Sequence, residues 1–209
     1  MNKEGLYDSN GRYLPLVEEF YTVQGEGFNT GKAAWFIRLG GCDVGCSWCD
    51  SRFTWNPEMH PLADTDGIIA RAVDSGTDSV VVTGGEPLIW NLDYLCGELK
   101  KRGIKTFIET SGACELSGTW DWICLSPKMN MPPADEICLK ADELKVIIHD
   151  GGDFEWAEKC RKRVGKSCHL FLQPEWSRYE KIIHDIVEYV KKNSCWKISL
   201  QAHKFMHIP

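Results

Sequence analysis

Long apolar runs are missing from this sequence. No stretch approaches the roughly 18 to 20 apolar residues that a membrane-spanning helix requires. The first residues, MNKEGLYDSNGRYLPLVEEF, also lack the continuous apolar core of a secretory signal peptide. We therefore expect a cytoplasmic protein with no membrane partner.

Positive charge is scarce as well. The chain has 24 Lys and Arg against 30 Asp and Glu, which gives a formal net charge of −6. Nucleic acids and anionic membranes are bound through clustered Lys and Arg. The charge balance therefore argues against a nucleic-acid partner.

Internal repeats, low-complexity tracts and long linkers are absent too. With 209 residues, 43% of them hydrophobic, the chain is long enough to bury a core as one compact domain. We expect residues 1–209 to form a single domain with a short N-terminal extension and a C-terminal tail.

Short apolar runs alternate with amphipathic segments along the chain. The continuous apolar runs favour a parallel sheet buried on both faces, with strands predicted at 33–39, 79–83, 105–110, 121–126, 143–148, 169–173 and 196–201. Helices are predicted at 65–74, 91–102 and 177–193. The connections 110–121 and 127–142 are too irregular for full helices. The pattern therefore predicts an α/β fold built as an incomplete parallel β/α barrel.

Unusual residues follow the predicted strands. Cys42, Gly84–Gly85, Glu109–Thr110, Ser126–Lys128 and Gln173–Pro174 all fall at or just after a strand's carboxyl end. Active sites of α/β sheets and barrels assemble at that end. We expect the functional site there.

Ten cysteines are many for a chain of this length, and only Cys42, Cys46 and Cys49 are clustered. Their C-x3-C-x2-C spacing can hold a [4Fe–4S] cubane, which would leave one iron without a protein ligand and open to a small molecule. Structural zinc is the alternative, but it needs a fourth ligand, and no second C-x-x-C is present. The other seven are interpreted as small core residues: Cys96, Cys114, Cys124, Cys138, Cys160, Cys168 and Cys195.

A second motif accompanies the cysteine loop. TGGEP stands at 83–87 after a predicted strand, and Trp48 lies beside the last clustered cysteine. The two motifs in this order resemble the radical S-adenosylmethionine superfamily. That resemblance implies that the methionine part of S-adenosylmethionine chelates the open iron and contacts the GGEP turn.

Further segments narrow the resemblance, and together they span most of the chain. FYTVQGEGFNTGKAAWFIRLGGC, CSWCDS, VVVTGGEPL, IETSG, LSPKMNM and SLQAHKFMHIP are similar to the 7-carboxy-7-deazaguanine synthase family. These lyases convert 6-carboxy-5,6,7,8-tetrahydropterin to 7-carboxy-7-deazaguanine and ammonia, on the route to queuosine and other 7-deazapurines. The resemblance implies radical ring contraction of a pterin substrate, Mg²⁺ beside the cluster, a homodimer and a flavodoxin-like electron donor.

The resemblance also implies roles for individual residues. The pterin would be bound by Val23, Gln24, Gly25, Glu26, Arg38, Thr83, His203 and the terminal Pro209, so that the C-terminal tail caps the substrate. S-adenosylmethionine would be bound by Trp48, Cys49, Asp50, Gly85, Glu86, Ser126, Pro127, Lys128, Gln173, Pro174, Glu175 and Trp176. Ser51 would bind Mg²⁺ where the family commonly has Thr.

Two alternatives remain open from the sequence. A glycyl-radical activating enzyme has the same cysteine spacing and a similar size, and it would act on a partner protein. A non-enzymatic iron–sulfur or zinc protein would need no GGEP turn, because it binds no cofactor there.

Overall fold

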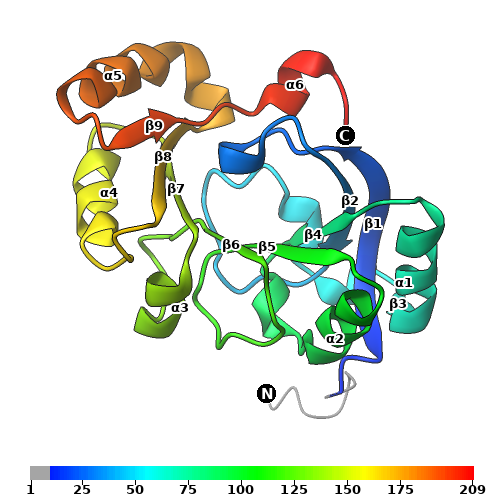
Figure 1. Cartoon of the computed structure of the whole chain (residues 1–209). Coiled ribbons are helices and arrows are strands. Elements are labelled where there is room, and N and C mark those ends of the chain that lie inside the picture. Colours follow the sequence, from blue (N-terminus) through cyan, green and yellow to red (C-terminus); the bar gives the residue numbers. More distant parts are fainter. Residues whose placement is uncertain (1–9) are drawn as a thin grey trace.

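The computed structural model describes residues 10–209, and within them the chain forms one curved nine-stranded sheet with helices on its outer face (Figure 1). The strand order is β3-β1-β2-β4-β5-β6-β7-β8-β9. β1 (Tyr13–Val23) pairs antiparallel with β2 (Ala33–Leu39) and with β3 (Leu62–Asp64), and all the other pairs are parallel. Over the described residues the sheet does not close, which confirms the predicted incomplete parallel barrel.

The parallel strands alternate with helices. The strands are β4 (Ser79–Gly84), β5 (Lys105–Thr110), β6 (Trp122–Leu125), β7 (Glu143–Ile148), β8 (His169–Pro174) and β9 (Trp196–Ile198). The helices are α1 (Thr65–Asp74), α2 (Asp93–Lys101), α3 (Asp135–Lys140), α4 (Asp153–Arg161), α5 (Tyr179–Lys192) and α6 (Ala202–Met206). Asp64 caps α1 by accepting the Gly67 N–H at 3.1 Å.

Alternation along each strand separates a helix-facing core from a lumen. On β7, Leu144, Val146 and Ile148 belong to the large core between sheet and helices, whereas Lys145 and Ile147 line the central cavity. The lumen therefore receives every second side chain, and its floor is apolar, formed by Ala34, Phe36 and Val81 with Phe20 and Phe107 packed on them.

A short 3-10 turn, η1 (Gly27–Asn29), covers the amino-terminal end of three strands. Its Phe28 ring stacks on Trp122 and His169, the first residues of β6 and β8, with centroid distances of 4.9 and 4.3 Å. The Phe28 N–H donates to Glu143, the first residue of β7, at 3.1 Å. This turn shuts the lumen at the end opposite the cysteine loop.

All seven predicted strands and all three predicted helices are present, with β6 and β9 shorter than predicted. β1, β3, α3, α4 and α6 were not predicted, and α3 is a six-residue helix inside the connection 127–142. β1 shows that the chain from Tyr13 onward belongs to the sheet. The part of the predicted N-terminal extension at residues 1–9 lies outside the described residues.

Two cysteine predictions need correction. Cys195 is exposed and Cys114 is only half-buried, because both lie in loops beside the core rather than in it. The remaining five of the seven scattered cysteines are buried as predicted.

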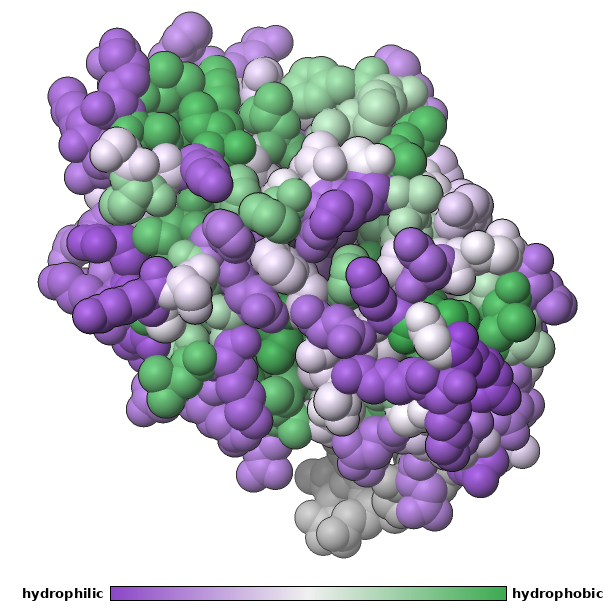
Figure 2. Space-filling view, viewed as in Figure 1, coloured by the Kyte–Doolittle hydropathy of each residue, from purple (hydrophilic) through white to green (hydrophobic). Residues whose placement is uncertain are grey.

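Within residues 10–209, no helix combines the length and apolar character needed to span a membrane. Figure 2 shows a face on which hydrophilic and apolar residues are interspersed.

Candidate active site

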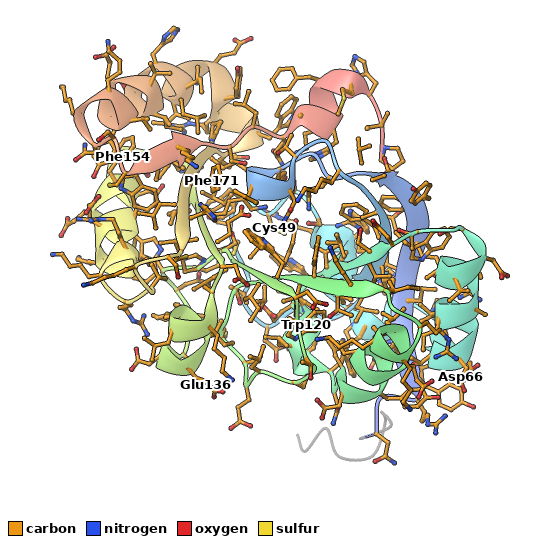
Figure 3. The ribbon with its side chains drawn as sticks, in the orientation of Figure 1. Cys49, Asp66, Trp120, Glu136, Phe154 and Phe171 are labelled. Atoms are coloured by element: carbon orange, nitrogen blue, oxygen red, sulfur yellow. The ribbon has the colours of Figure 1, made fainter. Side chains whose placement is uncertain are left out.

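A cavity of about 350 Å³ occupies the lumen at the carboxyl ends of the parallel strands. The loop after β2, strands β4, β5, β7 and β8, the segments after β1 and β6, and the C-terminal residues all contribute to its wall. Figure 3 places Cys49 in the interior of the molecule, whereas Asp66 and Glu136 lie on the outer helices α1 and α3. The cavity therefore lies at the end of the sheet where the sequence predicts the functional site.

The cysteine loop forms one side of the cavity. Cys42, Cys46 and Cys49 are free thiols, each half-buried, and all three line the cavity. Gly41 and Gly45 have φ values of 103° and 65°, which side chains with a Cβ rarely adopt. These two glycines let the chain turn tightly enough to aim three thiols at one volume.

The thiols fit a cluster better than a single metal ion. Among residues 10–209, no three His, Cys, Asp or Glu side chains are close enough together to share one ion. Burial is the main cause that raises the pKa of Cys42 and Cys46. Bound iron would reverse this effect because it stabilises thiolates. Three separated thiols on one cavity wall suit a cubane that takes one thiolate per iron.

The TGGEP turn is bonded directly to the cysteine loop. The Gly85 N–H donates to Leu39 O at 3.0 Å, and the Glu86 N–H donates to Gly41 O at 2.8 Å. A Cβ at Gly85 would lie 2.2 Å from Gly41 O and 2.8 Å from Cys42 Cβ. The two motifs thus lie closer together than any residue with a side chain at position 85 would permit.

The Glu86 side chain points away from the cavity. It is 1% exposed and accepts hydrogen bonds from Thr110 Oγ1 at 2.6 Å and from the Ser111 N–H at 2.8 Å. It also caps the following turn by accepting the Leu88 N–H at 3.1 Å. Glu86 therefore joins the GGEP turn to the end of β5, and only its backbone is near the expected cofactor.

The ends of β6 and β8, with the residues just after them, carry most of the other residues predicted to bind S-adenosylmethionine. Ser126, Lys128, Gln173, Pro174, Glu175 and Trp176 line the cavity, as do Trp48, Asp50 and Gly85. Pro127 is buried beside the cavity and is not part of its wall.

Lys128 is held over the cysteine loop. Its ammonium donates to Ser126 Oγ at 2.7 Å and lies 5.8 Å from the centre of the Trp48 ring. Burial is the main cause that lowers the pKa of Lys128, and the Cys46 thiol opposes that effect. A positive charge here would stabilise negative charge near the thiols.

The residues predicted to bind the pterin gather on the side of the cavity toward β1. Val23, Gln24, Gly25, Glu26, Arg38, Thr83, His203 and Pro209 all line it. Arg38 also forms an ion pair with Glu18 at 2.7 Å. Its guanidinium can therefore stabilise the fold through this pair and bind a ligand in the cavity. Burial lowers the pKa of His203, whose imidazole fills the space above Gly25.

A polar network connects these residues to the cluster loop. Gln201 Nε2 donates to Glu26 Oε1 at 2.9 Å, and Lys204 Nζ pairs with Asp50 Oδ2 at 2.7 Å. The side chain of Ser51 lines the cavity and donates to Asp50 Oδ1 at 3.2 Å. Helix α6, next to the C-terminus, is thereby attached to the loop that carries the cysteines.

Sequence reasoning missed one charged residue in the lumen, Lys145, and gave no binding role to Glu109, which it had placed only at the functional end of the sheet. Glu109 Oε1 accepts from Gln24 Nε2 at 2.8 Å and lies 3.8 Å from Lys145 Nζ. The signal was present, because a Lys in the middle of the apolar run ELKVII must either be exposed or face a polar interior.

Comparisons with known proteins agree with this geometry. The model of the Radical SAM superfamily matches residues 36–122. A 7-carboxy-7-deazaguanine synthase from Flavobacterium psychrophilum is 51% identical over 199 residues, covering 95% of this chain and 94% of the relative. The protein of the same name from Synechocystis sp. is 44% identical over 194 residues, covering 93% of each chain.

The fold agrees as well. The crystal structure of QueE from Escherichia coli matches with a TM-score of 0.83 at 31% identity, covering 97% of this chain and all of the other. The chain therefore belongs to the 7-carboxy-7-deazaguanine synthase family of the radical SAM superfamily.

Proposed function

We propose that the chain converts 6-carboxy-5,6,7,8-tetrahydropterin to 7-carboxy-7-deazaguanine and ammonia, as a carbon–nitrogen lyase in 7-deazapurine biosynthesis. One observation carries the proposal: a single cavity has the cysteine loop and GGEP turn on one side and a polar, partly charged wall on the other. Such a cavity can hold a cofactor and a small polar substrate in contact with each other.

Membership of the radical SAM superfamily implies a [4Fe–4S] cluster and S-adenosylmethionine. Cys42, Cys46 and Cys49 would hold the cluster, and when bound these groups supply the radical chemistry that a protein side chain cannot. Trp48 to Asp50, Gly85 with the Glu86 backbone, Ser126 to Lys128 and Gln173 to Trp176 would orient S-adenosylmethionine. The chain's own contribution is to bring the reacting carbon of the cofactor against the substrate and to exclude water.

The pterin would lie against Val23 to Glu26, with Arg38 binding its carboxylate through the planar guanidinium. Thr83, His203 and the carboxylate of Pro209 would complete the contact, and the network from Gln201 and Lys204 would fix the tail over the substrate. The apolar floor at Phe36 would receive one edge of the ring system.

Magnesium, a homodimer and a flavodoxin-like donor complete the proposal. Ser51 would bind Mg²⁺ through its hydroxyl, which faces the cavity. Serine supplies the same hard oxygen ligand as threonine but lacks the methyl group that restricts the rotamer.

Anaerobic turnover tests the proposal. Reconstituted protein, reductant, S-adenosylmethionine, Mg²⁺ and 6-carboxytetrahydropterin are incubated, and products are identified by mass spectrometry. The proposal predicts 7-carboxy-7-deazaguanine without stoichiometric 5′-deoxyadenosine, and no product from Cys46→Ala. Cleavage of S-adenosylmethionine with the pterin untouched would contradict the substrate assignment and favour an activating enzyme that acts on a protein.

A further inference from the structure

Lys145 is a buried cation in the wall of the lumen. It lies in the middle of β7 and is 3% exposed. Its Nζ contacts Glu26 Oε2 and lies 3.8 Å from Glu109 Oε1. A lysine so far from solvent is costly to bury unless negative groups surround it. The contacts of the Lys145 ammonium with Glu26 and Glu109 therefore raise the question of which groups they hold in place.

The charges that face Lys145 come from four elements. Glu26 follows β1, Glu109 lies on β5, Cys124 on β6 and Glu143 on β7, with Lys128 and His203 next to this group. Burial alone would lower the pKa of Lys145, but the acidic groups outweigh it and hold the pKa well above its usual value. After burial, Cys124 is the largest influence on the pKa of Lys145, followed by Glu109, Glu26 and Glu143, and burial raises the pKa of Cys124 itself.

Only two of these carboxylates touch the ammonium. Burial is the largest influence on the pKa of Glu26, yet the charge and hydrogen bond of Lys145, with hydrogen bonds from Gln201 and Gln173, bring the pKa below its ordinary value. Burial raises the pKa of Glu143 and so disfavours its ionised form, which opposes a third negative charge beside the ammonium. The ammonium of Lys145 is thus the common partner of two carboxylates, Glu26 and Glu109.

Both carboxylates keep acceptor capacity toward the cavity. Glu26 accepts from Lys145 at Oε2, from Gln201 at Oε1 and also from Gln173, and Glu109 uses Oε1 for Gln24 and Lys145. Each carboxylate oxygen has two lone pairs. In the described structure every recorded contact of Glu109 is made by Oε1, and its side chain is 25% exposed to the cavity. One oxygen of Glu109 is thereby left for a ligand.

We propose that Lys145 is a positioning residue, whose ammonium fixes the carboxylates of Glu26 and Glu109 as paired acceptors for the N–H groups of the pterin's aminopyrimidine edge. That edge presents the 2-amino group and N3–H side by side, and two carboxylate oxygens, one from Glu26 and one from Glu109, can accept these two donors. The inference rests on the proposed function, because it names how the same cavity recognises that substrate.

The test measures affinity and discrimination. Dissociation constants of the reconstituted enzyme are determined anaerobically by tryptophan fluorescence for 6-carboxytetrahydropterin and for its lumazine analogue, in which oxygen replaces the 2-amino group. The wild type is expected to bind the analogue about 10- to 100-fold more weakly, the loss typical of hydrogen bonds to a charged group. Lys145→Met is expected to bind the pterin weakly and to lose this discrimination.

A pH series separates positioning from a general structural role. Without the ammonium, the burial that raises the pKa of Glu26 is no longer offset by Lys145, so pterin binding by Lys145→Met should strengthen as pH rises while that of the wild type stays constant. Lys145→Arg keeps the charge and should retain part of the discrimination. Lys140→Met, which removes only an exposed pair with Glu136, is the matched control.

Folding and the cofactor site are followed independently. Thermal melting and the change in the cluster's electron paramagnetic resonance on adding S-adenosylmethionine should be unaltered in Lys145→Arg. If Lys145→Met does not fold, the double variant Glu26→Gln/Lys145→Met removes the ion pair as a unit and should also lack discrimination.

The other possible results overturn either the inference about Lys145 or the proposed function. Unchanged affinity, discrimination and pH dependence in Lys145→Met would overturn the inference and leave the proposed function standing. Loss of the S-adenosylmethionine response in the folded variants would also overturn it, since Lys145 would then support the whole site. A wild type that binds no pterin would overturn the proposed function, and the inference with it.

Discussion

Replacing Gly85 by alanine tests the contact between the GGEP turn and the cysteine loop. The new Cβ would lie 2.2 Å from Gly41 O, whereas ordinary contacts are 3.4–4 Å. The two segments must therefore separate by about 1 Å to reach a favourable distance. Neither side can yield by rotating a side chain, because the nearest atom belongs to the backbone.

The separation breaks two backbone hydrogen bonds, Gly85 N–Leu39 O and Glu86 N–Gly41 O. Leaving such groups unpaired costs about 1–3 kcal/mol each, so we expect a loss of roughly 2–6 kcal/mol. In a protein of this size that loss lowers Tm by about 4–24 °C. A displacement of about 1 Å should also lower turnover roughly 100-fold.

Scanning calorimetry of the reconstituted enzyme and turnover assays measure both effects. Gly97→Ala is the matched control, because Gly97 lies within α2 and a Cβ there meets nothing within 4 Å. That change should raise stability by about 0.5–1 kcal/mol through helix propensity. If Gly85→Ala melted and turned over like the wild type, the close approach of the two motifs would be refuted.

Three further predictions concern single side chains. Ser51→Ala should abolish the stimulation of turnover by Mg²⁺ while Ser51→Thr retains it, measured by titrating the metal; equal stimulation of both would remove Ser51 from the metal site. Lys204→Met breaks an ion pair with Asp50 whose partners are 22% and 52% exposed, so stability should change by less than about 1 kcal/mol while KM for the pterin rises. An unchanged KM would show that the tail needs no such anchor. Hydrogen bonds from the Trp196 indole and other donors outweigh burial and lower the pKa of Glu158 below its ordinary 4.5. Its stabilisation is therefore complete above pH 4.5 and is lost as pH falls through the folded pKa, so Glu158→Gln should flatten acid unfolding followed by circular dichroism; an unaltered profile would contradict this.

Much of the sheet could be predicted because its parallel strands are buried on both faces. A continuous apolar run such as SVVVT is stable only where both faces of the strand are buried. Gly103, with φ of 74°, follows α2 and ends it as a C-terminal cap. The strand β1 was missed because its pattern is irregular. Pro15 and the adjacent Glu18 and Glu19 interrupt the alternation, and the register shifts between Leu16 and Glu18.

Helix α4 was missed for a different reason. Of its nine residues only Ala157 and Cys160 are buried, so the sequence carries no clear apolar face. Helix α6 has no buried residue, and its position depends on contacts such as Lys204 with Asp50, far away in the chain.

The motifs predicted where the site lies, but not which way each side chain points. Glu86 belongs to a motif expected to bind the cofactor, yet its carboxylate bonds to Thr110 and Ser111. Lys145 belongs to a strand that was predicted from its apolar neighbours, and Glu109 was placed only at the carboxyl end of its strand. Their pairing across the lumen depends on which face of each strand turns inward, which short apolar runs leave undetermined.

Hydrogen transfer between substrate and cofactor tests the central claim that one cavity holds both in contact. The pterin is labelled with deuterium at C6 and turned over anaerobically, and S-adenosylmethionine and product are analysed by mass spectrometry. The account predicts that deuterium enters the 5′ position of S-adenosylmethionine as 7-carboxy-7-deazaguanine accumulates. Product formation with no deuterium in the cofactor would contradict it.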